Sequence, residues 1–355
     1  MNVTLKDIAK KTGVTPTVVS HVLNNRLGHI RVSKSKSLLI KKVAAQLGYI
    51  PNLKARAMIT QKSYTVGLIC SYPYTPDNQE LQSVVDSYMA SALRGVERAC
   101  REVNYHCLVS YCDLSNLENF VHPRAMKDGS VDGVVLIGYT CSDVVRKLAS
   151  MHIPCVQIGS NIEDGNKVER VYADLDDGFA QAVRYLSELG HKKVQLYLPD
   201  GPGPRLHAKT FQQLSGKIGG VETEAVLGPN LESHIEYGYK YAEEMLKHEN
   251  RPRAFIMGIV HAMGLSKCFS EAGLMCPRDY SLMYFSSNFT NRYICDESVS
   301  RPVSLIWWNG IDVGYLAARK LLDRLGVIEL SPEEKQQITI PCKLIQGASC
   351  APIRM

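Results

Sequence analysis

Short amphipathic patterns open the chain. Residues 4–12 carry apolar side chains at the spacing of one helical face, and Thr4 followed by Asp7 is a capping arrangement for a helix start. The apolar positions are Leu5, Ile8 and Ala9. Gly13 is expected to end this helix, because glycine adopts the left-handed C-cap conformation without strain. The pattern predicts a helix of about two turns.

A second amphipathic pattern follows directly. Thr15 can cap it, and Pro16 suits the first helical position, where a missing N–H costs little. Its inward side is formed by Val19, Val22 and Leu23. Its outward side carries Thr17, Ser20 and His21. A third helix is predicted between a Ser33 cap and Gly48, and three short helices with a tight turn between the first two are typical of a helix-turn-helix.

The outward side chains of the second pattern suit base edges in a DNA major groove. Hydroxyl groups donate or accept hydrogen bonds, a threonine methyl can contact a thymine methyl, and His21 can donate or accept. Residues 1–62 hold nine lysines and three arginines against Asp7 alone, a net charge of +11 that leaves −5 for the remainder. This imbalance favours a polyanionic partner. The alternatives are a helical packing module and a solvated basic face.

Residues 51–62 predict a short helix that leads out of this module. Pro51 and Asn52 can begin a helix of about eight residues, which is marginal in water by itself. A segment that orders only on its target would place Met58 as an apolar wedge between minor-groove base steps. The alternative is a plain linker with Met58 packed against the rest of the chain.

From Tyr64 onward, continuous apolar runs alternate with helical patterns. The runs are YTVGLIC, YHCLVSY, DGVVLIG, PCVQIGS, KVQLYLP, AFIMGI and YSLMYFS. Short apolar strands separated by helices predict parallel sheets covered on both faces, and such sheets bind ligands beyond the carboxyl ends of their strands. The number of runs predicts a body of two doubly wound α/β halves.

Several function classes lack support in the sequence. No apolar run has the length of a signal peptide or a membrane span, so we expect a cytoplasmic protein with no membrane partner. The eleven cysteines are scattered without a C-x-x-C pair, which favours free thiols over a zinc site. The loop PDGPGPRLH has prolines where a phosphate cradle needs N–H groups, and no Walker A, G-x-G-x-x-G, G-x-S-x-G or H-E-x-x-H motif is present. We therefore expect no enzyme, no catalytic residue, no metal and no cofactor.

Motifs along nearly the whole chain resemble bacterial transcription regulators of the lactose-repressor type, also called the LacI/GalR family. In the first 60 residues they are TLKDIAKKTGVT, VVSHVLN, LGYIPN and ARAM. In the body they are SVDGVVLI, YADLDDG, YLSELGHKKV and EAGLMCPRDYSLM. The resemblance implies an all-α helix-turn-helix head in residues 1–50, a hinge helix and linker in 51–62, and an effector-binding and dimerisation body in 63–355.

The resemblance also assigns roles in DNA binding. Two heads of a homodimer would bind double-stranded, pseudo-palindromic operator DNA, and paired hinge helices would insert Met58, where the family usually has leucine. His21 stands where arginine is the commoner residue, and GHIRVS lengthens the loop before the third helix. The DNA-binding candidates are Thr4, Thr15, Pro16, Thr17, Ser20, His21, Asn24, Asn52, Ala55, Arg56 and Met58.

For the body, the resemblance implies two Rossmann-like subdomains of the periplasmic-binding-protein type I, with an effector between them. The N-subdomain would comprise residues of about 63–172 and 302–326, and the C-subdomain about 173–301 and 327–355. The chain would cross between them near residues 172–174, 301–304 and 326. The effector-binding candidates are Asp174, His207, Ile259, Ser286 and Trp308.

Several polar groups that the family uses for its effector are replaced here. His207 lies where an arginine often holds the effector, Ile259 belongs to a pair that replaces Asn-Asp, and Ser286 stands in for an acid. Because carboxylates and arginine hold sugar hydroxyls through charge-assisted hydrogen bonds, these changes weaken sugar selectivity. Asp174 has an alternative role as a helix cap, and Trp308 as a core or interface residue.

The sequence thus predicts a sequence-specific DNA-binding transcriptional regulator, with repression as its expected action. Its operator affinity would be modulated by a small-molecule effector, for which carbohydrate-derived compounds are candidates. Two alternatives stay open at this point: a cytoplasmic binding protein for a sugar-like small molecule, and an effector-independent regulator with an empty cleft.

Overall fold

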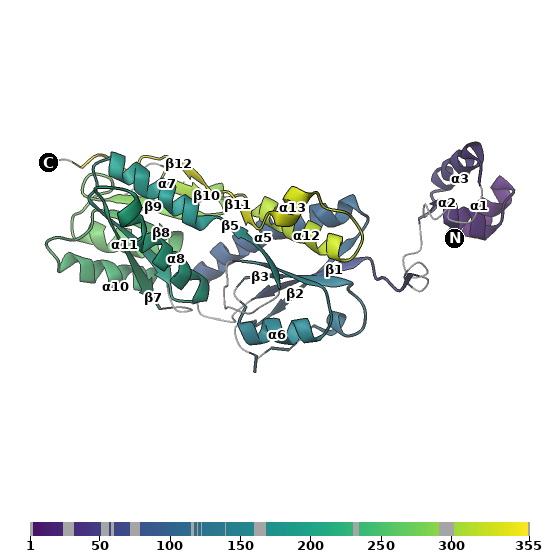
Figure 1. Ribbon diagram of the computed structural model, residues 1–355, viewed down its shortest axis with the longest axis horizontal. Helices are drawn as coiled ribbons and strands as arrows, with labels where there is room; N and C mark the ends of the chain where they lie inside the picture. The colour runs from purple at the N-terminus through teal and green to yellow at the C-terminus, as the bar shows by residue number, and fades with distance from the viewer. Residues whose placement is uncertain are drawn as a thin grey trace. The chain divides into compact units, whose positions relative to one another are not determined.

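The computed structural model separates the chain into two compact units, Met1–Ser63 and Tyr64–Met355 (Figure 1). We call them the head and the body. The residues that the structure describes are 3–23, 32–50, 57, 60–71, 79–114, 117–118, 120–121, 123–138, 140–159, 168–229, 234–290 and 302–353. Each unit is described by itself below.

The head contains the three predicted helices. They are α1 (Leu5–Thr12), α2 (Pro16–Leu23) and α3 (Lys34–Gln46). The Asp7 carboxylate accepts hydrogen bonds from the Thr4 N–H and hydroxyl at 2.8 and 2.7 Å, and Gly13 ends α1 with a φ of 64°. Ser33 caps α3 by accepting from the Lys36 N–H. The helices enclose a small core of Ile8, Ala9, Val19, Val22, Ile40 and Ala44.

The first lobe of the body is built on a sheet of parallel strands in the order β11-β5-β4-β3-β1-β2. Its strands are β1 (Thr65–Ser71), β2 (His106–Cys112), β3 (Gly133–Ile137), β4 (Cys155–Ile158), β5 (Glu169–Ala173) and β11 (Thr339–Ile340). Its helices are α5 (Gln79–Glu102), the 3-10 helix Arg124–Met126, α6 (Ser142–Ser150), α12 (Gly310–Arg324) and α13 (Pro332–Gln336). Central strands such as β3 are fully buried, whereas β2 lies at the sheet edge and is largely exposed.

The second lobe has a sheet in the order β12-β10-β9-β8-β6-β7, in which only β12 is antiparallel to its neighbour. Its strands are β6 (Lys193–Pro199), β7 (Glu222–Gly228), β8 (Ala254–Gly258), β9 (Ser281–Ser286), β10 (Ser304–Trp307) and β12 (Lys343–Ile345). Its helices are α7 (Leu175–Glu188), α8 (Pro202–Gln212), α9 (Leu214–Lys217), α10 (His234–Leu246) and α11 (Ile259–Glu271). The predicted arrangement of a helical head and an α/β body with two halves is confirmed.

Two of the three expected crossings between the lobes are wrong. The chain enters the second lobe directly after β5, close to the expected residues 172–174. The expected return near 301–304 is incorrect, because β10 pairs with β9 and the chain reaches the first lobe only at α12. The expected crossing near Gly326 is also incorrect, because β11 still pairs with β5 of the first lobe. The first lobe therefore extends to about residue 340, and its second segment begins near 310 rather than 302.

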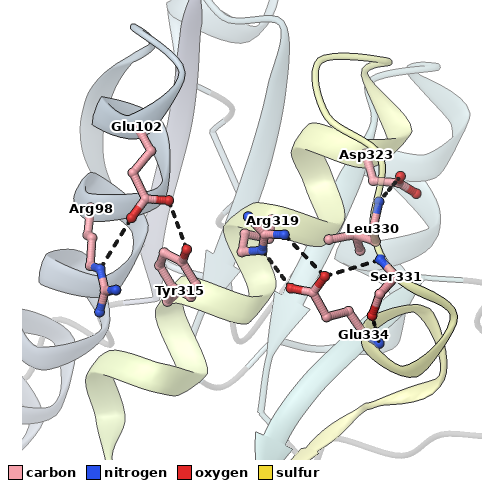
Figure 2. Close-up of polar contacts among 8 residues, drawn as sticks. All are labelled: Arg98, Glu102, Tyr315, Arg319, Asp323, Leu330, Ser331 and Glu334. Atoms are coloured by element: carbon pink, nitrogen blue, oxygen red, sulfur yellow. Dashed lines mark hydrogen bonds and ion pairs between the residues drawn. The ribbon is translucent and has the colours of Figure 1, made fainter.

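A polar network explains why the chain stays on the first lobe beyond Gly326 (Figure 2). Arg319 of α12 forms a bidentate pair with Glu334 of α13 at 2.8 and 3.1 Å, and this guanidinium holds the pKa of Glu334 below its usual range. The same carboxylate accepts from the Ser331 N–H that precedes α13. One turn earlier on the same face of α12, the Tyr315 ring lies against the Arg319 guanidinium and its hydroxyl donates to Glu102 of α5 at 2.8 Å. The network joins α5, α12 and α13. Because β11 follows α13 directly, the network also keeps β11 at the first lobe.

In the first lobe, helices α5 and α12 pack against each other with their backbones in contact (Figure 1). A Cβ atom added at Gly95 would lie 2.0 Å from the carbonyl oxygen of Ile311. One added at Gly314 would lie 2.0 Å from the carbonyl oxygen of Ala92. The two helices therefore cross at a distance that only glycine permits at these positions.

Helices α10 and α11 repeat this arrangement in the second lobe. A Cβ atom at Gly238 would lie 2.0 Å from the carbonyl oxygen of His261, and one at Gly264 would lie 1.9 Å from that of Ile235. Each lobe thus contains one helix pair whose backbones touch through a glycine from each helix.

Gly314→Ala is expected to lower the free energy of unfolding by about 1–3 kcal/mol, because the added methyl group would force α5 and α12 apart. Chemical denaturation of the full chain measures this loss. Gly216→Ala is the matched control: Gly216 lies in α9 with no neighbouring atom within 4 Å of an added Cβ, and alanine favours a helix by up to about 1 kcal/mol. Equal effects of the two substitutions would contradict the role of the glycine contact.

A buried histidine makes the stability of the second lobe depend on pH. His191 is 3% exposed, and its Nε2 lies 2.9 Å from the Ser281 hydroxyl, which also bonds to the Ala351 N–H. Burial lowers the pKa of His191, because the charged imidazolium loses its hydration inside the lobe. The neutral form is therefore the one that the folded chain holds.

The free energy of unfolding is expected to fall as the pH drops below about 6.5, the ordinary histidine pKa. Below this pH the unfolded chain binds a proton that the folded chain takes up only at lower pH, so acid favours unfolding. Denaturant titrations between pH 7.5 and 5.5 measure the slope, and His191→Gln should reduce it. His248→Gln, at an exposed position after α10, serves as the control and should leave the slope unchanged. A slope that survives His191→Gln would exclude this origin.

Candidate DNA-binding head and ligand-binding lobes

The outward face of α2 carries the three side chains that the sequence singled out. Thr17 is exposed, and Ser20 and His21 are partly exposed, whereas Val19 and Val22 on the opposite face are buried. The three polar residues lie at positions i, i+3 and i+4 of one helix, which places them on one side of it. They form a compact polar surface on the head.

The remaining described candidates lie at the amino-terminal ends of α1 and α2. Thr4 precedes α1 and is exposed, and its hydroxyl donates to Asp7. Thr15 precedes α2, and its hydroxyl accepts from the Val18 N–H at 3.4 Å. Pro16 is the first residue of α2, as its fixed φ favours. Helix amino termini attract anions such as phosphate, so these positions suit the DNA backbone.

The head surface around these residues is basic. Its described lysines are Lys6, Lys10, Lys11, Lys34, Lys36, Lys41, Lys42 and Lys62, of which Lys36 and Lys62 are partly exposed and the others are exposed. Asp7 is the one acidic side chain among residues 1–62, and its two hydrogen bonds to Thr4 lower its pKa. The positive charge therefore has no acidic cluster to balance it. The candidates Asn24, Asn52, Ala55, Arg56 and Met58 lie outside the described residues.

In the body, the effector candidates follow the carboxyl ends of strands. Ile259 comes directly after β8, Ser286 is the last residue of β9, and Trp308 comes directly after β10. His207 lies in α8, the helix that follows β6. Because β6, β8, β9 and β10 are parallel, these four positions belong to one edge of the second sheet. Asp174 follows β5 of the first sheet.

The side chains of Asp174, His207 and Ser286 each form a hydrogen bond within the protein. Asp174 caps α7, and its carboxylate accepts from the Asp177 N–H at 3.2 Å. Nδ1 of His207, which is 5% exposed, lies 2.7 Å from the Asp176 carboxylate. The Ser286 hydroxyl accepts from the Asn288 N–H, and Ile259 is buried in the core of the second lobe. The cap role that the sequence left open for Asp174 is the one the structure shows.

Trp308 lies where the two lobes meet. Its side chain packs against the hydrophobic cores of both lobes, and its indole Nε1 is buried with no hydrogen-bond partner among the described residues. The ring of Tyr88 from α5 meets the Trp308 ring edge-on, with centroids 6.4 Å apart. Asn288, two residues after the end of β9, donates from its side-chain amide to the Ser87 hydroxyl of α5 at 2.7 Å. Helix α5 of the first lobe is therefore bonded to the strand ends of the second.

Sequence reasoning missed several of these residues. Asp176 lies two positions after Asp174 in the same motif, so its acidity was visible but its pairing with His207 was not. Asn288 and Ser87 are 201 positions apart, and neither has a local pattern that indicates the other. Their contact follows from the way the lobes assemble.

Among the described residues, no group of three or more histidine, cysteine, aspartate or glutamate side chains could hold a metal ion. In the same part of the chain, no helix is both long and apolar enough to cross a membrane.

Comparison with known protein families and curated proteins gives two kinds of match. Residues 4–52 match the model of bacterial regulatory proteins of the lacI family, and residues 183–350 match that of the periplasmic-binding-protein-like domain. The HTH-type transcriptional repressor PurR of Escherichia coli O139:H28 is 27% identical over 363 residues, covering 98% of this chain and 97% of the repressor. The PurR repressor of Klebsiella pneumoniae is 26% identical over 361 residues, with the same coverage.

Solved structures show the same fold. The lac repressor dimer bound to operator and the anti-inducer ONPF has a TM-score of 0.68 at 17% identity, covering 99% of this chain and all of that one. The complex of the transcriptional regulator CelR with cellobiose has a TM-score of 0.64 at 20% identity, covering 98% of this chain and all of that one. The chain therefore carries an amino-terminal domain of the lacI family of bacterial regulatory proteins followed by a periplasmic-binding-protein-like domain, and it is a DNA-binding transcriptional regulator that is similar along nearly its whole length to the PurR repressors.

Proposed function

We propose that this regulator represses transcription by placing α2 in the major groove of its operator. Thr17, Ser20 and His21 would contact base edges, and the ends of α1 and α2 at Thr4 and Thr15 would contact phosphates. The observation that carries the proposal is the coincidence of this exposed polar face with a head of net charge +11. Base contacts supply specificity, and the lysines supply the salt-dependent affinity for the duplex.

We further propose that the regulator binds as a homodimer to a pseudo-palindromic operator. Two-fold symmetry places one recognition helix on each half-site. The edge strand β2 supports a second copy as the partner, because it exposes Leu108, Val109 and Tyr111 at an edge where no further strand pairs with it among the residues that the structure describes. A related structure is a lac repressor dimer on its operator. The hinge residues Asn52, Ala55, Arg56 and Met58, together with Asn24, belong to this proposal on the sequence alone.

For the body we propose a small-molecule effector at the carboxyl edge of the second sheet, near Trp308 and His207. Two relatives support this class of ligand, since one was solved with cellobiose and one with ribose. His207 stands where the family often has an arginine, and it is paired with Asp176. Asp174 and Ser286 form hydrogen bonds with nearby backbone N–H groups. We therefore propose that the effector is not an ordinary free sugar.

A second candidate is a regulator that works without an effector. The bond between Asn288 and Ser87 and the packing of Tyr88 on Trp308 hold the lobes together through the side chains of the protein itself. A ligand shifts an equilibrium only by its difference in affinity for the two arrangements. Contacts that already favour one arrangement of the lobes reduce the change in that equilibrium that a ligand can cause.

Selection of bound sequences from a random DNA library tests the regulator proposal. The full chain should enrich one pseudo-palindromic sequence. Ser20→Ala and His21→Ala should each weaken binding to that sequence by about 1–3 kcal/mol, because each removes a base contact, while affinity for bulk DNA stays unchanged. Gel-shift titration with and without competitor DNA separates the two affinities.

The control for this experiment is Ser150→Ala, which removes an exposed hydroxyl from α6 of the body. It should bind both DNAs as the parent chain does, and circular dichroism should show equal folding of all variants. Absence of any enriched sequence, or equal loss of specific and bulk affinity in the α2 variants, would overturn the assignment.

Isothermal titration against monosaccharides and oligosaccharides, ribose and cellobiose among them, tests the effector proposal. We expect no binding at micromolar concentration, because the Asp174, His207 and Ser286 side chains form hydrogen bonds within the protein rather than being presented to sugar hydroxyls. Titration with the selected operator in the same buffer shows that the protein is active. One sugar with micromolar affinity would be enough to reject this part of the proposal.

A further inference from the structure

The carboxyl half of the first sheet contains two buried polar side chains with incomplete hydrogen bonding. Ser71 is the last residue of β1 and is 2% exposed, and Gln157 lies in β4 and is 3% exposed. Neither the Ser71 hydroxyl nor the Gln157 amide nitrogen has a hydrogen-bond partner in the part of the chain that the structure describes. Burial of such groups costs free energy, so two of them close to one edge of a sheet favour a role in binding.

The register of the strands places both side chains on one face of the sheet. Gln157 is paired with Leu136 of β3, and Leu136 is paired with Ile69 of β1. Ser71 shares the face of Ile69, because it lies two positions further along the same strand. Ile69 and Leu136 pack in one hydrophobic cluster with Val144 of α6. Gln157 and Ser71 therefore lie on the α6 side of the sheet, with Ser71 nearer its carboxyl edge.

Two glycines leave this edge without side chains between its strands. Gly138 directly follows β3 and Gly159 directly follows β4, and both are partly exposed. Their φ angles of 91° and 134° lie in the region that favours glycine. A Cβ atom added at Gly138 would lie 3.1 Å from the Cβ atom of Ser71. One added at Gly159 would meet the Gly138 carbonyl oxygen at 4.0 Å and no closer atom of the described chain, so the edge is open there.

The groups around these glycines are donors and a cation. The Gln157 amide nitrogen can only donate, and a serine hydroxyl can donate as well. Helix α6 begins at the same edge because it follows β3, and its N-cap Cys141 forms no side-chain hydrogen bond with the N–H groups of the first turn. The one acidic residue of that turn, Asp143, is paired with Arg146. Arg170 of β5 is paired in register with Gln157. This set suits an acceptor that carries negative charge.

We propose that this edge binds the oxyanion group of a small molecule, a phosphate or a carboxylate, with Gln157 and Ser71 as donors. The ligand oxygens would supply the acceptors that these two groups lack, and Gly138 and Gly159 would let the ligand approach the backbone closely. At the lobe boundary the Trp308 indole N–H is a further donor without an acceptor among the described residues.

This site would extend the proposed effector site from the second lobe onto the first, so its regulatory meaning rests on the proposed function. It also narrows the class of effector. The donors call for an acidic derivative, such as a sugar phosphate or a sugar acid, in place of a free sugar.

Inorganic phosphate is the probe for this site. The full-length chain is titrated at a constant ionic strength that screens the lysines of the head, and binding is measured by the line width of the phosphate signal in phosphorus NMR. We expect saturable binding that Gln157→Met weakens about tenfold or more, because a hydrogen bond to a charged group is lost. Ser71→Ala should also weaken it. Acetate as a competitor separates the two sources: it displaces phosphate if carboxylates are held, and it leaves phosphate bound if a phosphate group is required.

Folding stability separates ligand contact from a structural role. In urea titrations of the free chain, Gln157→Met should keep or raise the unfolding midpoint, because an apolar group of similar size replaces a buried amide without a partner. Gln212→Met, at an exposed position of α8, is the matched control and should change neither midpoint nor phosphate binding.

Three results would overturn the proposal: no phosphate binding by the parent chain, equal binding by the parent and Gln157→Met, or a lower midpoint for Gln157→Met. Since no DNA is present in these titrations, a failure here leaves the operator selection unaffected. A failure of the operator selection likewise leaves the phosphate result as measured.

Discussion

Backbone contact between paired helices is the constraint on which the arrangement of the body depends. At Gly95 and Gly314 the first lobe has no room for a methyl group between α5 and α12, and at Gly238 and Gly264 the second lobe has none between α10 and α11. Such contact fixes the position of a helix more narrowly than side-chain packing, because backbone atoms cannot change rotamer. Since α12 is held against α5, the chain must leave β10 and return to the first lobe at Trp308 and the residue after it.

That return places an aromatic side chain at the boundary between the lobes. Trp308 contacts both cores, so a change in the angle between the lobes must move it relative to at least one of them. Its indole N–H has no hydrogen-bond partner in the described part of the chain, and burial of such a group costs free energy in the present arrangement. Tyr88 and the Asn288–Ser87 hydrogen bond compensate from the side of α5. The boundary is thus a set of a few specific contacts, which suits a body that has more than one arrangement.

The sequence predicted those features that local patterns determine. Strands with continuous apolar runs, such as β3 and β8, and the caps at Thr4 and Ser33 follow from neighbouring residues, and all were found. Strand β7 was missed, because it lies at the edge of the sheet and its polar residues interrupt the apolar run. The crossing expected near Gly326 came from the family resemblance, and the ion pair between Arg319 and Glu334 that moves it is not visible in either local stretch. Likewise, the helix-cap role of Asp174 was foreseen as one of two possibilities, whereas the partner of His207 was not foreseen.

The small size of the recognition surface has a consequence for assembly. Thr17, Ser20 and His21 offer single hydrogen bonds or methyl contacts rather than the bidentate pairs of arginine or asparagine, so at the proposed base edges each would contribute near the lower end of the expected range, about 1 kcal/mol. One head then supplies roughly 3 kcal/mol of discrimination, whereas specific sites are typically favoured over bulk DNA by about 4–10 kcal/mol. The lysines of the head cannot close this gap, because phosphate contacts favour every sequence equally. Two heads on one operator double the discrimination and bring it into the required range. Recognition through these three side chains, as proposed, therefore calls for two copies joined by the body.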